Sequence, residues 1–160
     1  KDYVSLMPTN LYGSFDNFDL KSSHVLPAML RKFHEAKLNN NADVTLWGSG
    51  TPMREFLFVD DMAEAVVYAL ENKLSNYLYN VGSGKEVSIK ELANIIQKIT
   101  GHEGKVFWDS KKPDGTPRKL MDISKMKDLG WNYSTELEEG IKKTYAWFLN
   151  NKDNLKECKI

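Results

Sequence analysis

A few side chains in this sequence have the chemistry that a binding or catalytic site needs. Imidazole titrates near neutral pH, so His24, in the first turn of an expected helix, is a candidate for proton transfer. Trp47 and Arg54 flank the segment GSGTPM, and an indole can lie against a base or sugar while a guanidinium binds phosphate. Taken singly, each of the three is better explained by a structural role, in packing, in a lid or in a surface ion pair.

Other motifs that could carry chemistry fail on their spacing. In NVGSGKEVS a phosphate-binding loop would need glycine in place of Tyr79 and serine or threonine in place of Glu86. A dinucleotide fingerprint would need a third glycine where Val87 stands. We therefore interpret Gly82 and Gly84 as a turn between a strand and a helix.

The sequence predicts no metal site, because His24, His34, His102 and Cys158 show no metal-ligand spacing. Cys158 is the single cysteine, which excludes an internal disulfide and favours a reducing compartment, so we expect a cytoplasmic protein.

Composition argues against some partners. The 22 basic and 22 acidic side chains balance, so no overall field would attract nucleic acid or a membrane surface. Any anion site must be local, and the basic stretch KKPDGTPRK at 111–119 is the one dense cluster of cations. With 160 residues, 41% of them hydrophobic, the chain can bury a core of its own.

The pattern of apolar residues predicts alternating strands and helices, which is typical of an α/β protein. Strands are expected at residues 3–7 (buried), and at VTLW, REFLFV, NYLYNV and KVFW. Helices are expected to begin at Ser22 or Ser23, at Asp60 or Asp61, at Ser88 with Glu91, near residue 123, and at Thr135 with Glu138. In the second helix the residues predicted to point inward are Met62, Val66, Ala69 and Leu70.

Taken together, five stretches resemble one enzyme family both in their order along the chain and in their amino-acid sequence. They are VSLMPTNLYG, SSHVLPAMLRKFHEA, LWGSGTPMREFLFVDDMA, YNVGSG and KPDGTPRKLMD. The chain resembles the GDP-L-fucose synthases, which are NADPH-dependent 3,5-epimerase/4-reductases of the extended short-chain dehydrogenase class. The resemblance implies NADP(H) as cofactor, a GDP-sugar as substrate and a homodimeric parent enzyme.

The catalytic Tyr-x-x-x-Lys motif of that family does not occur in this chain. We therefore expect the C-terminal, substrate-binding half of such an enzyme, with the N-terminal Rossmann half absent and no reductase activity in isolation. Residues 1–150 would form this half, with 1–13 as the last Rossmann strand and cofactor loop, and 151–160 would be a polar tail. The alternative is a stand-alone module that binds a nucleotide sugar without catalysis.

The resemblance assigns a role to each matching residue. It places Pro8, Thr9, Asn10 and Leu11 against the cofactor, gives His24 cofactor contact and proton transfer, and assigns substrate binding to Lys32, Trp47, Arg54, Lys112 and Asp114. Lys32 stands where the family often has arginine, so a point charge replaces a bidentate contact. These roles predict that His24, Trp47 and Arg54 converge around one hollow.

Overall fold

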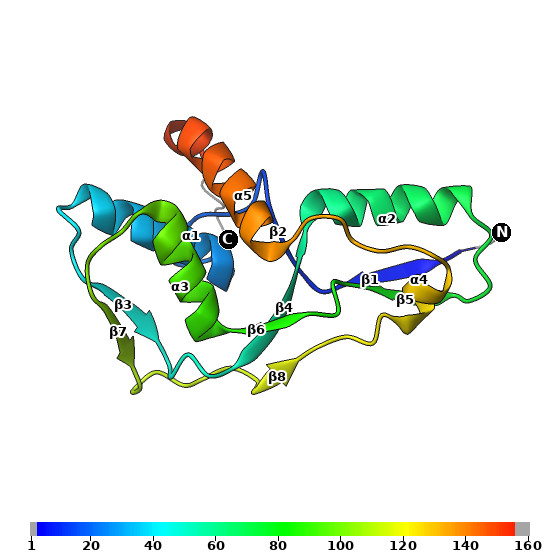
Figure 1. Ribbon diagram of the computed structural model, residues 1–160, viewed down its shortest axis with the longest axis horizontal. Coiled ribbons are helices and arrows are strands. Elements are labelled where there is room, and N and C mark those ends of the chain that lie inside the picture. Colours follow the sequence, from blue (N-terminus) through cyan, green and yellow to red (C-terminus); the bar gives the residue numbers. More distant parts are fainter. Residues whose placement is uncertain (1–2, 156–160) are drawn as a thin grey trace.

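The computed structural model describes residues 3–155, in which strands and helices alternate (Figure 1). The strands are β1 (Ser5–Pro8), β2 (Asn10–Tyr12), β3 (Val44–Trp47), β4 (Met53–Phe58), β5 (Leu78–Val81), β6 (Glu86–Ser88), β7 (Val106–Asp109) and β8 (Arg118–Lys119). The helices are α1 (Val25–Leu38), α2 (Val59–Glu71), α3 (Ile89–Thr100), α4 (Ser124–Asp128), α5 (Leu137–Asn151) and the 3-10 helix η1 (Lys152–Asn154). The predicted α/β class is confirmed.

The strands pair in three small groups. β1 runs parallel to β5, and β3 runs parallel to β7. The third group is built around β4, which is parallel to β2 and β8 and antiparallel to β6. In Figure 1, β4 runs between the end of the molecule that holds β1, β5 and α2 and the end that holds α1, α3, β3 and β7.

Strand β4 also separates two apolar cores. Phe56 and Phe58 belong to the larger core, which α1, α3, α5 and β3 complete. Leu57 belongs to the smaller core, with residues of α2, β5 and α4. Because side chains alternate between the two faces of a strand, this one strand supplies both cores.

Helix α3 begins and ends as its sequence predicts. The Ser88 Oγ accepts a hydrogen bond from the Glu91 N–H at 3.1 Å, and the Glu91 carboxylate accepts one from the Ser88 N–H at 3.0 Å. Gly101 ends the helix in the left-handed conformation at φ +69°. Leu92 and Ile96 of the predicted apolar face are fully buried.

Three predicted N-caps are wrong. The N-cap residues are His24 for α1, Phe58 for α2 and Glu136 for α5, in place of Ser22 or Ser23, Asp60 or Asp61, and Thr135. Some of the expected caps have other partners. Asp61 is buried and accepts hydrogen bonds from the N–H groups of Ser134 and Thr135 at 2.9 and 3.2 Å. The Ser22 hydroxyl donates to the Asp19 carboxylate at 2.9 Å.

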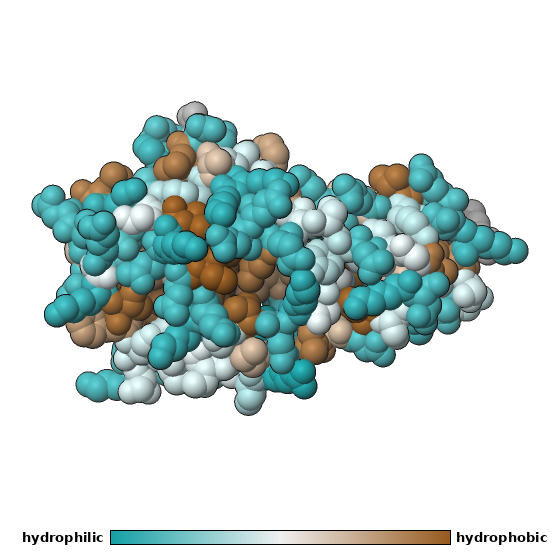
Figure 2. Space-filling model, in the orientation of Figure 1, coloured by the Kyte–Doolittle hydropathy of each residue, from teal (hydrophilic) through white to brown (hydrophobic). Residues whose placement is uncertain are grey.

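Two apolar stretches that were predicted to be buried are exposed. Met7 in β1 is 52% exposed, and Val66 and Leu70 in α2 are 41% and 81% exposed. Helix α2 instead buries Asp61 and Ala65, one turn apart. Figure 2 shows apolar atoms among the hydrophilic ones at the right-hand end of the view, where α2 and β1 lie. Within residues 3–155, no helix is long and apolar enough to cross a membrane.

Candidate functional site

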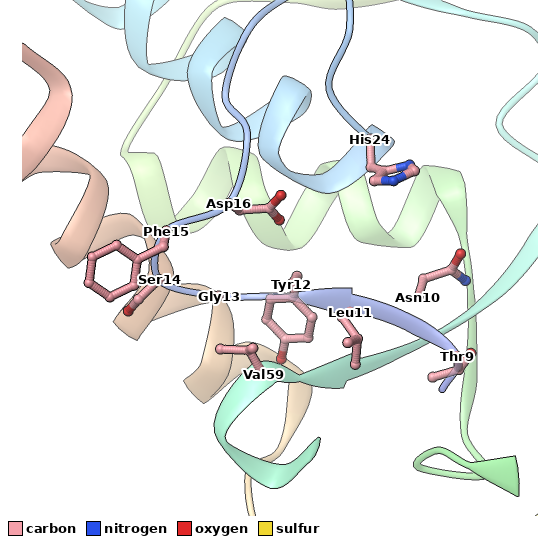
Figure 3. A pocket seen from close by; sticks show the side chains of 10 residues that line it. All are labelled: Thr9, Asn10, Leu11, Tyr12, Gly13, Ser14, Phe15, Asp16, His24 and Val59. Atoms are coloured by element: carbon pink, nitrogen blue, oxygen red, sulfur yellow. The ribbon is translucent and has the colours of Figure 1, made fainter. Parts of the chain in front are cut away.

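A cavity of about 520 Å³ opens beside β2, at the start of α1 (Figure 3). Its walls are formed by Thr9, Asn10, Leu11, Tyr12, Gly13, Ser14, Phe15, Asp16, His24 and Val59. We call this cavity the His24 pocket. It brings together His24 and three of the four residues predicted to meet the cofactor, while Pro8 is not part of its lining.

The segment that crosses from β1 to β2 is held in place by its own polar groups. The Thr9 N–H donates to the Val81 carbonyl at 3.0 Å. The Asn10 side-chain amide donates to the Glu55 carbonyl at 2.7 Å, and the Thr9 hydroxyl donates to the same carbonyl at 3.3 Å. These bonds fix the wall of the pocket to β4 and β5, so the groups that line it are held in position before any ligand binds.

His24 is the N-cap residue of α1, but its imidazole makes no capping hydrogen bond. Its backbone carbonyl accepts from the Ala28 N–H at 3.1 Å and so begins the helix. Figure 3 shows the ring on the same side of the pocket as the Asn10 amide. The backbone thus places His24 at the pocket while the ring stays available to a ligand.

A second group of predicted residues gathers at the end of β3. Trp47 is 68% exposed, and the Lys32 and Lys112 ammonium groups lie 5.9 and 5.2 Å from the centre of its ring. We call these three side chains the Trp47 cluster. Two cations beside an exposed indole combine positive charge with a flat apolar surface, which suits an anionic ligand that carries a ring.

Asp114 links the basic loop to the turn after β3. Its carboxylate accepts hydrogen bonds from the Ser49 N–H at 2.8 Å and from the Ser49 hydroxyl at 2.7 Å. These bonds from Ser49 lower the pKa of Asp114. Gly48 is required here, because it has φ +78° and an added Cβ would lie 2.2 Å from the carboxylate. Asp114 therefore shapes the loops beside Trp47.

Arg54 holds the other end of the basic loop. Its Nη1 donates to the Met53 carbonyl at 2.7 Å and to the Thr116 carbonyl at 2.6 Å. Its other guanidinium nitrogen, Nη2, lies close to Gly115, where an added Cβ would approach within 2.8 Å. Among the described residues Arg54 makes no ion pair, so its charge is not neutralised by a nearby carboxylate.

The His24 pocket and the residues around Trp47 and Arg54 lie near each other but are separate. Lys32 follows His24 by eight residues on α1, which is about 12 Å along the helix axis. Arg54 precedes Glu55, whose carbonyl holds the wall of the His24 pocket. None of three cavities among residues 3–155, the His24 pocket included, is lined by His24, Trp47 and Arg54 together, so these three side chains are not brought into a common hollow there.

Comparison with known proteins identifies the family. Residues 1–82 match the model of the NAD dependent epimerase/dehydratase family. The chain belongs to this family. Relatives in it include the probable GDP-L-fucose synthase 1 of Oryza sativa, which is 54% identical over 94% of this chain and 46% of the relative. GDP-L-fucose synthase of Escherichia coli is 50% identical over 98% of this chain and 51% of the relative.

Solved structures agree with the family assignment. A GDP-L-fucose synthetase from Naegleria fowleri, bound to NADP, superposes with a TM-score of 0.90 at 32% identity, over 96% of this chain and 49% of that chain. This chain spans about half the length of the curated relatives it matches.

The structure also reveals polar residues that the sequence did not single out. Glu55 is fully buried, and its carboxylate accepts hydrogen bonds from the Gly84 N–H at 2.7 Å and the Met121 N–H at 3.1 Å. The available signal in the sequence was the presence of Glu55 directly before the apolar run of β4. Asp16 enters the His24 pocket from the loop after β2, and no pattern in that polar loop distinguishes it.

Metal ligation has no support in the part of the chain that the structure describes. Among those residues, no group of three or more His, Cys, Asp or Glu side chains lies close enough to hold a metal ion. Cys158 lies outside the described residues. His34 is buried and shares a hydrogen bond between Nδ1 and the Tyr145 hydroxyl at 2.9 Å, and His102 is buried with Nε2 at 2.8 Å from the Ala42 carbonyl.

Proposed function

We propose that this chain is the substrate-binding half of an NADPH-dependent epimerase/reductase that converts GDP-4-keto-6-deoxy-D-mannose to GDP-L-fucose. The pocket that His24 shares with Thr9, Asn10 and Leu11 carries this proposal. Support comes from relatives that are 50–54% identical and named GDP-L-fucose synthases. The assignment of residues 1–150 to this half stays a prediction.

The residues of the His24 pocket fit the nicotinamide end of NADP(H). Leu11 and Val59 supply apolar wall, and Thr9 and Asn10 supply polar groups held by fixed hydrogen bonds. A flat ring that carries an amide matches such a mixed surface. When bound, the cofactor would supply the hydride that reduces C4, and the chain's own residues would orient the sugar beside it.

Proton transfer at the sugar is the step that falls to His24. The protons at C3 and C5 are both adjacent to the C4 ketone, so their removal gives an enolate. Imidazole is suited to accept such a proton at neutral pH, and general acid-base catalysis typically contributes about 10²- to 10⁴-fold in rate. The His24 ring is free of capping hydrogen bonds, as this role requires.

Binding of the diphosphate and nucleotide is assigned to the Trp47 cluster and Arg54. The net charge of the chain is zero, so attraction of a diphosphate must come from local cations. Lys32, Lys112 and Arg54 provide three, and Trp47 provides a surface for a base or sugar. The separation of about 12 Å along α1 suits an extended nucleotide sugar whose reactive ring lies at His24. Asp114 would hold the loops and accept hydrogen bonds with its remaining lone pairs.

We further propose that catalysis requires a second half, which the relatives of twice the length contain. It would cover the exposed apolar side chains around β1, β5 and α2. These are Tyr3, Val4, Met7, Val66, Val67, Leu70, Tyr77 and Leu78, each at least 38% exposed. Large apolar side chains gathered on the surface in this way usually mark an interface. Homodimerisation of the whole enzyme rests on the family resemblance, and a cytoplasmic location rests on the single cysteine. Both stay predictions.

The test compares this chain alone with the same chain joined to the N-terminal half of a relative. We expect NADPH oxidation in the presence of GDP-4-keto-6-deoxy-D-mannose only from the joined protein. The chain alone should bind GDP weakly, as calorimetry can measure. Turnover by the chain alone would contradict the need for a second half, and a joined, folded protein without turnover would contradict the assigned reaction.

The alternative is a nucleotide-sugar-binding module without catalysis, which the Trp47 cluster favours because its indole and two ammonium groups could hold a ligand without His24. Deuterium exchange at C3 or C5 of the bound sugar separates the two functions, because only an enzyme incorporates deuterium from solvent. Binding of GDP without exchange by the joined protein would support the module.

A further inference from the structure

Asp16 is a second ionisable group in the His24 pocket, and nothing in the family resemblance assigns it a role. It lies in the loop after β2, and Figure 3 shows its carboxylate pointing toward the side of the pocket on which His24 lies. Its Oδ1 accepts a hydrogen bond from the Asn17 N–H at 2.7 Å. Its Oδ2 is buried and accepts no hydrogen bond from any residue in the described range. A buried acceptor without a donor is costly, so this oxygen calls for an explanation.

The backbone of the loop forces Asp16 into this position. Gly13 passes so close to α2 that an added Cβ would lie 2.4 Å from the Val59 Cγ1. Two residues later Phe15 has φ +65°, an unusual conformation for a residue with a side chain. The chain turns sharply at these two positions, and the turn brings Asp16 back over the pocket.

His24 is the charged residue that acts on the Asp16 carboxylate. Burial raises the pKa of Asp16, whereas the Asn17 hydrogen bond and the charge of His24 oppose this rise. Tyr12 is the third ionisable residue of the pocket lining, and because burial raises its pKa it stays neutral. On its other side Asp16 borders a cavity whose ionisable residues already have partners. They are Arg31 with Glu35, Asp19 with Ser22, Lys152 with Asp153, and His34 with Tyr145.

We propose that Asp16 is a positioning residue for His24, a carboxylate in the same pocket whose negative charge stabilises the charge that the ring gains when it accepts a proton. This inference rests on the function proposed above. In the step concerned, the C–H bond at C3 or C5 breaks, its electron pair forms the enolate, and the proton bonds to the imidazole. The resulting imidazolium would share the pocket with the Asp16 carboxylate. Reprotonation of the carbon on the opposite face, with a proton drawn from water, completes the inversion, and the ring returns its proton to water.

The kinetic test uses Asp16→Asn in the chain joined to its catalytic half. Asparagine keeps the shape and the Asn17 hydrogen bond but removes the charge. We expect deuterium exchange at C3 and C5 to fall by about 10-fold or more, with the Michaelis constant changed less than about twofold, because acid-base steps depend on the charge of the base. Asp16→Glu should restore part of the rate. The matched control is Asp19→Asn, in the same loop but outside the His24 pocket, which should exchange at the normal rate.

A second measurement does not depend on the proposed reaction. NMR titration of the Asp16 carboxyl group in the chain itself, with and without His24→Gln, reports their coupling directly. Loss of the histidine charge should move the Asp16 titration to higher pH, while the Asp19 carboxyl, which serves as internal control, stays in place. An unchanged Asp16 titration, or normal exchange in Asp16→Asn, would overturn the inference. Absence of exchange in the unsubstituted enzyme would instead count against the proposed function.

Discussion

Replacement of the buried Glu55 by alanine should destabilise the protein strongly. The substitution removes the acceptor for the N–H groups of Gly84 and Met121, which the carboxylate binds at 2.7 and 3.1 Å. A buried donor left without a partner costs about 1–3 kcal/mol. Because Gly84 is exposed and Met121 is half-buried, water can partly replace the lost acceptor, and the lower part of that range applies to each. We expect Glu55→Ala to lower the free energy of unfolding by about 2–4 kcal/mol.

Urea denaturation followed by tryptophan fluorescence measures this loss. Since a domain is stable by only about 5–15 kcal/mol, Glu55→Gln provides a milder variant that keeps one acceptor oxygen and should cost about 1–2 kcal/mol. The control is Glu35→Ala, which removes an exposed ion pair with Arg31 one turn away on α1 and should cost no more than about 0.5 kcal/mol. If Glu55→Ala proved as stable as Glu35→Ala, the carboxylate would not be what holds the turn at Gly84.

Three further outcomes follow from the site and the fold. His24→Gln in the joined enzyme should reduce deuterium exchange by about 100-fold or more while GDP affinity measured by calorimetry stays nearly constant; lost affinity with normal exchange would make it a binding residue only. Arg54→Ala should raise the Michaelis constant for the GDP-sugar by about 10-fold with a smaller effect on turnover, and an unchanged constant would remove it from phosphate binding. Ser88→Ala, which breaks the capping box of α3, should cost about 1 kcal/mol in thermal or urea unfolding, and no loss would mean that tertiary packing alone sets this helix start.

The features that the sequence predicts well are local ones. The capping box at Ser88 and the glycine end of α3 involve residues a few positions apart, so their hydrogen bonds follow from spacing alone. Val66 and Leu70 were predicted to point inward because apolar periodicity identifies a face but not what covers it. Asp61 looked like a cap because its partners, more than 70 residues away, could not be seen in sequence.

In the candidate site, too, contacts between residues far apart in the sequence could not be predicted from local patterns. His24 and Asn10 line one pocket, and the family resemblance predicts that both meet the cofactor, because similar sequences carry three-dimensional information that composition lacks. Their contact with a cofactor stays a prediction. Asp16 was missed because its position depends on a turn set by contact between Gly13 and Val59. The contact of Asp114 with Ser49 likewise joins loops 65 residues apart, which no local pattern indicates.

The alternation along β4 has a consequence for how such a chain can diverge. Inserting one residue into this strand would exchange the sides on which Phe56, Leu57 and Phe58 lie, and both cores would lose their fit at once. Hydrogen bonds such as those of Asp114 and Arg54 tie residues 111–117 to the framework, but these residues, which precede β8, are all exposed and belong to neither core. Changes in length should therefore accumulate there, beside Trp47, so that ligand preference can drift over evolutionary time while the framework stays fixed.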